Sequence, residues 1–255
     1  MTFLEVQSRY TDFLNAVPGS CKDKLRVDAV VESLKDWSEY ETIDTIKSWF
    51  VEEQKNCSMT IEEISLLECK GWSLNSDKGV FSHISGDFFY IQGLRIKNTV
   101  AREVVGGWDQ PILTQVGYKG GLLGLLRKKI NTIPYYLVDA KAEPGNPDKL
   151  QISPTLQATF SNLNQAHGGK KPKFADFFEF PERFNGKVLF DQWMSEDGGR
   201  LHLKRNRGII VEVDESVEIP DLLTSHKWMT LYQLKALIKE NSWVSPHIRS
   251  IISHL

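Results

Sequence analysis

Residues 139–171 read DAKAEPGNPDKLQISPTLQATFSNLNQAHGGKK, and they join an expected strand at 150–159 to a loop that carries His167. Two turn signals, Pro144-Gly145 and Gly168-Gly169, bracket the segment. Core strands rarely carry many amides and hydroxyls, because each buried group without a partner costs about 1 kcal/mol or more. The segment is therefore either a polar surface loop or one wall of a site for a small, highly hydroxylated molecule. The side chains in question are Gln151, Ser153, Thr155, Gln157, Thr159, Ser161, Asn162 and Asn164.

The composition of the whole chain is that of a globular protein without a charge bias. Its 31 basic and 33 acidic residues give a net charge of −2, so no global field marks it as a nucleic-acid binder. No apolar run reaches the ~18 residues that a membrane-spanning helix needs. Glu5 and Asp12 interrupt the N-terminal stretch, which lacks a signal-peptide core. We therefore expect a cytoplasmic protein with neither a membrane nor a nucleic-acid partner.

The cysteines and the known short motifs point to no cofactor. Cys21, Cys57 and Cys69 form an odd set without a CxxC pair, which fits neither a zinc site nor a disulfide framework. Reduced thiols are the expectation. The sequence also lacks the GxGxxG, GxxxxGK[ST] and HExxH patterns that bind dinucleotides, nucleoside triphosphates and zinc.

The hydrophobic pattern changes its period along the chain and predicts three blocks. Residues 1–55 read as helices, with Val30, Val31 and Leu34 on one apolar stripe and a second helix at 42–54. A capping box that starts at Thr60 predicts a further helical turn. Closing helices are expected at 230–240 and 246–255. The middle block holds a short helix at 174–180 and predicted strands at 72–74, 80–84, 88–96, 112–116, 120–130, 135–140, 150–159, 188–194 and 201–213.

This order of elements indicates an α+β fold with mostly antiparallel strands and with helices segregated at the two chain ends. We expect a helical extension at residues 1–55 and a single domain at residues 56–255.

A basic cluster, KRNR at 204–207, lies inside one of the expected strands. Side chains alternate between the faces of a strand, so Arg205 and Arg207 point to one face and Lys204 to the other. The two arginines could grip one anionic group together, or the cluster could be a solvated charged face. Beside the polar segment 139–171, such a pair suits a phosphorylated or nucleotide-linked sugar.

Six blocks of the sequence together carry a resemblance to a known family. The most specific are AKAEPGNPDKLQISPTLQATFSNLNQAHGG (140–169) and KRNR (204–207). The others are GWSLNSDKGVFSHISGDFFYIQGLRI (71–96), WDQPI (108–112), GLLGLL (121–126) and WMTLYQLKALI (228–238). Over residues 45–254 the chain resembles an NDP-hexose 2,3-dehydratase.

The resemblance implies both an activity and a fold. Members of this family act on a nucleotide-linked, usually dTDP-linked, 4-keto-6-deoxyhexose and remove water across C2 and C3 on the way to deoxysugars. Their fold is described as Nudix-like, usually in two tandem copies within a chain that dimerises. This sequence departs in carrying one copy, about 40 additional N-terminal residues and no Nudix box. We therefore expect a Nudix-like domain, a homodimer, and a lyase that needs neither a metal nor a redox cofactor.

The implied chemistry depends on the ketone at C4, which acidifies the proton on C3. A base removes that proton to give an enolate, and the C2 hydroxyl leaves once an acid protonates it. The resulting enol tautomerises to a 3,4-diketo sugar. The protein must supply a base, an acid and donors for the enolate oxygen.

The candidates for proton transfer are His167 and Glu143, followed by Lys141 and Glu196. A histidine exchanges protons near neutral pH, and burial favours the protonated form of a carboxyl group. The alternatives are a structural histidine for His167 and a carboxylate that only holds a turn for Glu143.

The candidates for substrate binding follow from the same blocks. The diphosphate suits Arg205 and Arg207, with Lys204 and Asn206 beside them. Trp108 or Trp193 could stack on the nucleobase or the sugar, or else pack in the core. The sugar hydroxyls suit Gln157, Ser161 and Asn162, and Gln110 is a further candidate for substrate binding. Two other functions stay open: an isomerase or epimerase on the same substrate class, and a protein that binds a nucleotide sugar without turning it over.

Overall fold

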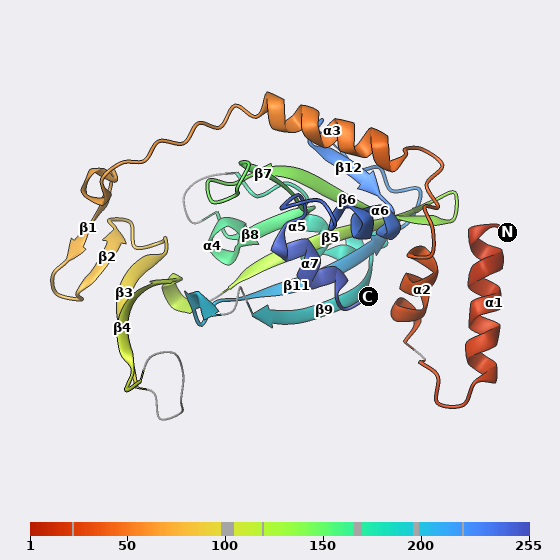
Figure 1. The fold of residues 1–255 in the computed structure, drawn as a ribbon, viewed down its shortest axis with the longest axis horizontal. Helices are drawn as coiled ribbons and strands as arrows, with labels where there is room; N and C mark the ends of the chain where they lie inside the picture. The colour runs from red at the N-terminus through yellow and green to blue at the C-terminus, as the bar shows by residue number, and fades with distance from the viewer. Residues whose placement is uncertain (22, 98–104, 119, 166–169, 196–198, 221) are drawn as a thin grey trace.

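The computed structural model describes residues 1–255 except 22, 98–104, 119, 166–169, 196–198 and 221. Two β-sheets and their helices make up this part of the chain (Figure 1). None of the helices within it is long and apolar enough to cross a membrane. The α-helices are α1 (Phe3–Ala16), α2 (Lys24–Glu32), α3 (Ile43–Asn56), α4 (Phe160–Leu163), α5 (Ala175–Glu179), α6 (Leu231–Leu237) and α7 (Pro246–Ile252), and the 3₁₀-helices are η1 (Leu66–Glu68), η2 (Val116–Tyr118) and η3 (Pro181–Phe184).

The larger sheet, which we call the main sheet, is built around the hairpin of β5 (Gly121–Ile130) and β6 (Ile133–Ala142). Asn131 and Thr132 link these strands with φ of 49° and 72°, the positive values that a tightly twisted two-residue hairpin requires. The sheet order is β12-β6-β5-β11-β9, with β7 beside β6 and β8 beside β5. The remaining strands are β7 (Leu150–Pro154), β8 (Leu156–Thr159), β9 (Lys187–Ser195), β11 (Arg205–Val213) and β12 (His226–Met229).

Side-chain alternation divides the core between the two faces of the main sheet. Leu123 of β5 belongs to a buried cluster that includes Phe50 of α3 and Ile248 of α7. Leu122 belongs to a second cluster, with Phe178 of α5. Helices from the two chain ends therefore cover one face, and the helices between β8 and β9 cover the other.

The smaller sheet, which we call the arm sheet, extends away from the main sheet (Figure 1). Its first four strands form an antiparallel meander, and β10 joins β4 in parallel. Among its strand residues only Ile112 and Thr114 are buried. The sheet order is β1-β2-β3-β4-β10, with β1 (Trp72–Asn75), β2 (Val80–His83), β3 (Tyr90–Ile96), β4 (Trp108–Thr114) and β10 (Leu201–His202).

The structure confirms the expected α+β architecture, with antiparallel pairing predominant and two parallel pairs, β5–β11 and β4–β10. Two local predictions were wrong, and one strand was missed. Ser65, not Thr60, caps the turn before β1, because the reciprocal bonds of the capping box form between Ser65 and Glu68. Val30 is exposed because α2 turns Ala29, Val31 and Glu32 inward instead, and Leu34 is exposed beyond the end of that helix. Strand β12 was not predicted.

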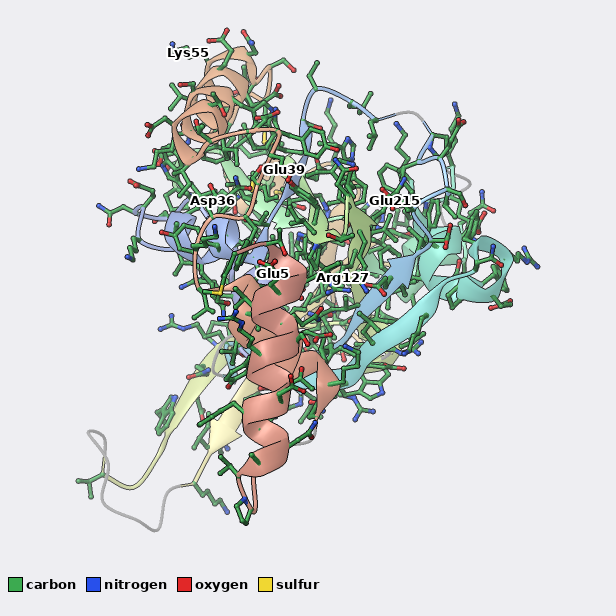
Figure 2. All side chains as sticks on the ribbon, turned by 90° about the vertical axis from the view of Figure 1, so that its right-hand side faces the viewer. Glu5, Asp36, Glu39, Lys55, Arg127 and Glu215 are labelled. Carbon is green, nitrogen blue, oxygen red and sulfur yellow. The ribbon has the colours of Figure 1, made fainter. Side chains whose placement is uncertain are left out.

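Helix α2 is tied to the main sheet through a buried ionic cluster on the side of the molecule shown in Figure 2. The Arg127 guanidinium donates to Glu32 Oε1 at 2.7 Å and also contacts Glu212. The Tyr136 hydroxyl donates to Glu32 Oε2 at 2.8 Å. Glu32 is 1 % exposed and Arg127 is 3 % exposed, so the two charges depend on each other instead of on water.

Burial affects the two donors of this cluster differently. Burial alone would lower the pKa of the Arg127 guanidinium. The interactions with Tyr136 and Glu32 outweigh this effect, so that the pKa is raised. Burial, followed by the charge of Glu32, raises the pKa of the Tyr136 hydroxyl well above its ordinary value. Tyr136 therefore stays a hydrogen-bond donor to Glu32.

We expect Glu32→Ala to lower the free energy of unfolding by about 3 kcal/mol, because it leaves a buried guanidinium and a buried hydroxyl short of an acceptor. Urea denaturation measures this loss. The matched control is Glu52→Ala, which removes a carboxylate from an exposed pair with Lys55 and should change stability by less than about 0.5 kcal/mol. Equal losses in the two variants would contradict a special role for the cluster.

Candidate functional site

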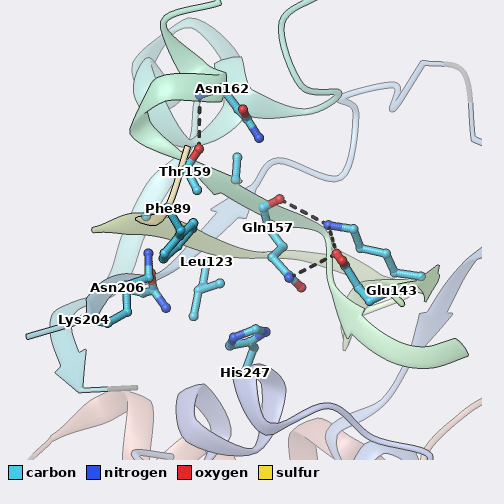
Figure 3. A pocket seen from close by; sticks show the side chains of 12 residues that line it. Phe89, Leu123, Glu143, Gln157, Thr159, Asn162, Lys204, Asn206 and His247 are labelled. Carbon is cyan, nitrogen blue, oxygen red and sulfur yellow. Dashed lines mark hydrogen bonds and ion pairs between the residues drawn. The ribbon is translucent and has the colours of Figure 1, made fainter. Parts of the chain in front are cut away.

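A polar pocket of about 280 Å³ lies on the face of the main sheet that α7 covers (Figure 3). Strands β5 and β8 form its floor, α7 lies on one side, and the junction with the arm sheet lies on another. Six of the residues that the sequence singled out for a site line it together: Lys141, Glu143, Gln157, Asn162, Lys204 and Asn206. The polar segment and the KRNR strand thus meet in one pocket.

Strand register explains why the floor of the pocket is polar. Thr159 and Gln157 of β8 lie opposite Gly121 and Leu123 of β5, and all four line the pocket. Gly121 lets the strands beside it approach closely. A Cβ there would lie 2.8 Å from Asn206 Oδ1 and 2.9 Å from the carbonyl oxygen of Ala158.

Other polar residues of the segment serve the core. Thr155 is buried between β5 and β6, where it donates to the Leu137 carbonyl at 2.5 Å and accepts from the Leu126 amide at 2.9 Å. Gln151 donates to the Ser242 carbonyl at 2.8 Å. The residues at 150–162 are therefore not one surface loop: those at its start satisfy core hydrogen bonds, and those at its end face the pocket.

Glu143 is the centre of a small network at one end of the pocket (Figure 3). Its Oε1 lies 3.0 Å from the Lys141 ammonium and accepts from the Gln157 amide at 3.3 Å. The Lys141 ammonium also donates to the Gln157 carbonyl at 3.4 Å. The side chain of Glu143 is 38 % exposed, so the carboxylate is held in place yet remains open to a ligand.

Lys204 lies at the opposite end, where the main sheet meets the arm sheet. Its ammonium donates to Gln115 Oε1 at 2.7 Å, and the buried Gln115 amide donates to the Gly120 carbonyl at 2.8 Å. The ammonium also lies 5.4 Å from the ring centre of Phe89, another pocket residue. The buried Gln115 side chain thus holds the positive charge of Lys204 at this end of the pocket.

Sequence reasoning missed His247, which lines the pocket from the first turn of α7. Ser245 caps this helix by accepting from the Ile248 amide, and Pro246 occupies its first position. Pro246 was recognised as the start of a helix, but nothing local indicated that the next residue would face strands far away in the sequence.

Arg205 and Arg207 point to the opposite face of β11 from Asn206. Arg207 makes two hydrogen bonds with Asp191, at 2.7 and 2.5 Å, and this pairing lowers the pKa of Asp191 and raises that of Arg207. The Arg205 guanidinium lies 4.7 Å from the ring centre of Trp193. The two arginines share one face of β11, as expected, but neither of them lines the pocket.

Three further predicted residues, Trp108, Gln110 and Ser161, do not line the pocket. Trp108 donates to Gln110 at 2.6 Å within β4 of the arm sheet. Ser161 lies in α4, beside Asn162 but outside the lining. His167 and Glu196 lie outside the described residues. Within the ranges that the structure covers, no group of three or more His, Cys, Asp or Glu side chains is placed to hold a metal ion.

Comparison with protein families decides where this chain belongs. The family model described as NDP-hexose 2,3-dehydratase matches residues 43–255. The chain belongs to this family.

Two curated members show how much of their length the chain shares. It is 35 % identical over 206 residues to a dTDP-4-dehydro-6-deoxy-alpha-D-glucopyranose 2,3-dehydratase of Saccharopolyspora spinosa, covering 80 % of this chain and 40 % of that protein. It is 33 % identical over 215 residues to the enzyme of the same name from Amycolatopsis orientalis, covering 83 % and 44 %. The chain therefore spans less than half the length of these relatives.

One solved structure with some likeness is a Nudix hydrolase from M. smegmatis, RenU. The match covers 58 % of this chain and 92 % of that protein, with 11 % identity and a TM-score of 0.30. A likeness at this score carries no argument about the fold or the site of the dehydratase-family chain.

We expect Gly121→Ala to destabilise the protein by about 1–3 kcal/mol, because the added methyl overpacks the floor of the pocket against Asn206 and Ala158. Gly145→Ala is the matched control, since no atom lies within 4 Å of its added Cβ. Urea denaturation of both variants tests this. A Gly121→Ala variant as stable as the control would show that Asn206 and Ala158 can move to make room for the added methyl group.

Proposed function

We propose that this protein removes water across C2 and C3 of a nucleotide-linked 4-keto-6-deoxyhexose. The observation that carries the proposal is the pocket that brings Glu143, Lys141 and His247 together in a chain of the dehydratase family. The curated relatives are named for this reaction on a dTDP-linked 4-keto-6-deoxyglucose, and we propose the same substrate here.

The size of the pocket suggests how such a substrate is placed. At about 280 Å³ it is just below the ~300–1,000 Å³ range of ligand pockets, which suits a hexose better than a whole nucleotide sugar. We place the sugar inside, against Gln157 and Asn162, and the diphosphate at the Lys204 end. Lys204 and Asn206 face this space, whereas Arg205 and Arg207 face away from it.

We assign removal of the C3 proton to Glu143. Its carboxylate is anchored by Lys141 and Gln157, and its exposed part leaves oxygen lone pairs for the substrate. As negative charge moves to the C4 oxygen, the nearby Lys141 ammonium stabilises it more than it stabilises the neutral ketone.

We assign protonation of the leaving C2 hydroxyl to His247. A histidine can carry a proton near neutral pH and return it in the same turnover. The C2–O bond then breaks, water leaves with the added proton, and the enol at C2 and C3 takes a solvent proton at C2 to become the 3-ketone. The electron pair of the broken C3–H bond thus ends in the new double bond, and no oxidant is consumed.

Incubation with dTDP-4-keto-6-deoxyglucose in deuterated buffer tests the proposed function. A product lighter by one water and carrying solvent deuterium at C2 supports dehydration. Deuterium at C3 with the C2 hydroxyl retained would point to an isomerase or epimerase instead. Binding without exchange or loss of water would identify a nucleotide-sugar binding protein.

We expect Glu143→Gln and His247→Asn each to lower kcat by about 10²–10⁴, the usual contribution of one general acid or base, with affinity for dTDP kept. Steady-state kinetics and calorimetric titration of dTDP separate the two effects. Glu62→Gln is the matched control, an exposed carboxylate outside the pocket. Full turnover in both pocket variants would remove these residues from the mechanism.

A second prediction compares the two faces of the KRNR strand. Lys204→Met should weaken dTDP binding by about tenfold or more, because it removes a charge-assisted contact worth about 1.5–3 kcal/mol. Arg205→Met is the control from the opposite face and should change affinity less than threefold. The reverse order would move the diphosphate to the arginine face.

We also propose three features of the molecule as a whole. Residues 1–55 serve as a helical extension of a domain at 56–255, which the buried contact of Glu32 with Arg127 supports. The protein acts in the cytoplasm without nucleic acid, in keeping with its balanced charge. It forms a homodimer, since two-fold dimers are the commonest assembly of such proteins.

A further inference from the structure

A second cavity, which we call the arm cavity, lies on one face of the arm sheet. Its volume is about 620 Å³, more than twice the volume of about 280 Å³ of the pocket described above, and within the ~300–1,000 Å³ range of ligand pockets. Strands β1, β2 and β3 supply most of its wall, and the turns on either side of β2 and the start of η2 complete it. Six of the strand residues that line it are Ser73, Asn75, Val80, Ser82, Tyr90 and Gln92.

Strand alternation places hydroxyl and amide groups of the arm sheet on the face of this cavity. Ser73 lies directly opposite Ser82. Phe81 lies opposite Ile91, so their neighbours Ser82 and Tyr90 project to the other face of the same two strands. One face of the sheet thus gathers apolar side chains, and the face of the arm cavity gathers polar ones.

Two amide side chains of the arm cavity are held in place by hydrogen bonds within the arm sheet. Gln92 donates to the hydroxyl of the fully buried Thr114 at 2.8 Å. The side-chain oxygen of Asn75 accepts from the backbone amide of Lys78 at 3.1 Å. In the part of the chain that the structure describes, no hydrogen bond engages the Gln92 oxygen or the Asn75 nitrogen. The cavity therefore offers a ligand both an oriented acceptor and an oriented donor.

The charge of the lining favours an uncharged, polar ligand. Among the described residues that line the arm cavity there is no carboxylate, and Lys78 is the only lysine or arginine. Tyr90 adds an aromatic ring, a surface on which a nucleobase can stack. Hydroxyl and amide groups beside such a ring match the chemistry of a nucleoside, whose base and sugar carry donors and acceptors without a full charge.

The arm cavity begins next to the end of the pocket that holds Lys204. Phe89 lines the pocket, and the next residue, Tyr90, lines the arm cavity. Gln115, which accepts from the Lys204 ammonium, is followed by Val116, another residue of the arm cavity. Consecutive Cα atoms are about 3.8 Å apart, so both connections bring the arm cavity close to Lys204.

We infer that the arm cavity binds the nucleoside of the nucleotide-linked sugar. The substrate then spans both cavities, with its hexose in the pocket, its diphosphate at Lys204 and its nucleoside against Gln92, Asn75 and Tyr90. The inference rests on the proposed function and locates the part of the substrate that the pocket is too small to hold.

Calorimetric titration of the full chain with dTDP and with inorganic pyrophosphate tests the inference. Gln92→Leu removes the oriented amide, and Ser82→Leu fills the cavity while leaving the bond between Gln92 and Thr114 in place. Each variant should weaken dTDP binding at least tenfold. Each should weaken pyrophosphate binding less than threefold, because pyrophosphate occupies only the Lys204 end.

The matched control is Gln54→Leu, the same change as at Gln92 but on α3 and outside the lining of both cavities. It should change neither affinity by more than twofold, and circular dichroism confirms that all three variants fold. Unchanged dTDP affinity in both cavity variants would overturn the inference. So would equal losses of dTDP and pyrophosphate affinity, or a wild-type chain that binds dTDP no more tightly than pyrophosphate.

The titrations and the assay in deuterated buffer fail independently of each other. A wild-type chain that removes water from the sugar, with cavity variants that bind dTDP normally, would retain the proposed function and overturn the nucleoside site. A chain that turns nothing over, with cavity variants that lose dTDP affinity, would retain the nucleoside site and overturn the proposed function.

Hydrogen exchange of the unmodified chain provides a test that needs no variant to fold. Saturating dTDP should slow the exchange of backbone amides at 73–75, 80–83 and 90–92, whereas saturating pyrophosphate should leave them unchanged. Amides of α1, which is not part of the arm sheet, serve as the internal control. Exchange in the three arm strands that dTDP does not slow, or that pyrophosphate slows equally, would contradict a nucleoside in the arm cavity.

Discussion

The backbone pairing of β5 is the constraint on which the rest of the structure depends. Along one edge, β8 pairs with its residues 121–124 and β6 with its residues 126–130, while β11 pairs with residues 121–128 along the other edge. A slip of one residue would turn every side chain of the strand to the opposite face. Gly121 and Leu123 would then enter the aromatic core around Phe178, and Leu122 would fill the pocket. The polar floor and the apolar core are thus fixed by the same register.

The sequence predicted those features that depend on local pattern. Alternation along 204–207 correctly separated Lys204 from the two arginines, because the parity of side chains is a property of a single strand. Which face would meet the pocket is a different matter. Asp191 and Trp193 of β9 contact the two arginines on the face away from the pocket. The pairing of β9 with β11 brings these residues together, and the pattern of a single strand does not predict that pairing. Similarly, the polar residues at 150–159 indicated an unusual strand. The sequence did not show that Thr155 bonds to β5 and β6 in the core, whereas Gln157 lines the pocket.

His247 marks the limit of sequence reasoning for the site. Pro246 predicted the helix that carries His247, and Ser245 caps that helix through a local hydrogen bond. The pocket that His247 faces, however, is lined by residues of β5, β8 and β11, which are distant in the sequence. Glu32 is a similar case in the core. A glutamate near the end of a short helix reads as a surface residue, and only the packing of α2 on β5 and β6 brings it to Arg127 and Tyr136. Long-range contacts of this kind have no signature in the spacing of one segment.

The route of the chain from β10 to β11 has a mechanical consequence. His202 ends a strand of the arm sheet, Arg205 begins a strand of the main sheet, and only Leu203 and Lys204 lie between them. Leu203 takes a left-handed backbone conformation, with φ of 52°, so this connection has little freedom to adjust. A ligand that touches both Lys204 and Lys141 would bridge the two sheets across the cavity. Such a ligand would therefore restrain the orientation of the arm sheet relative to the main sheet, in addition to the short connection between β10 and β11.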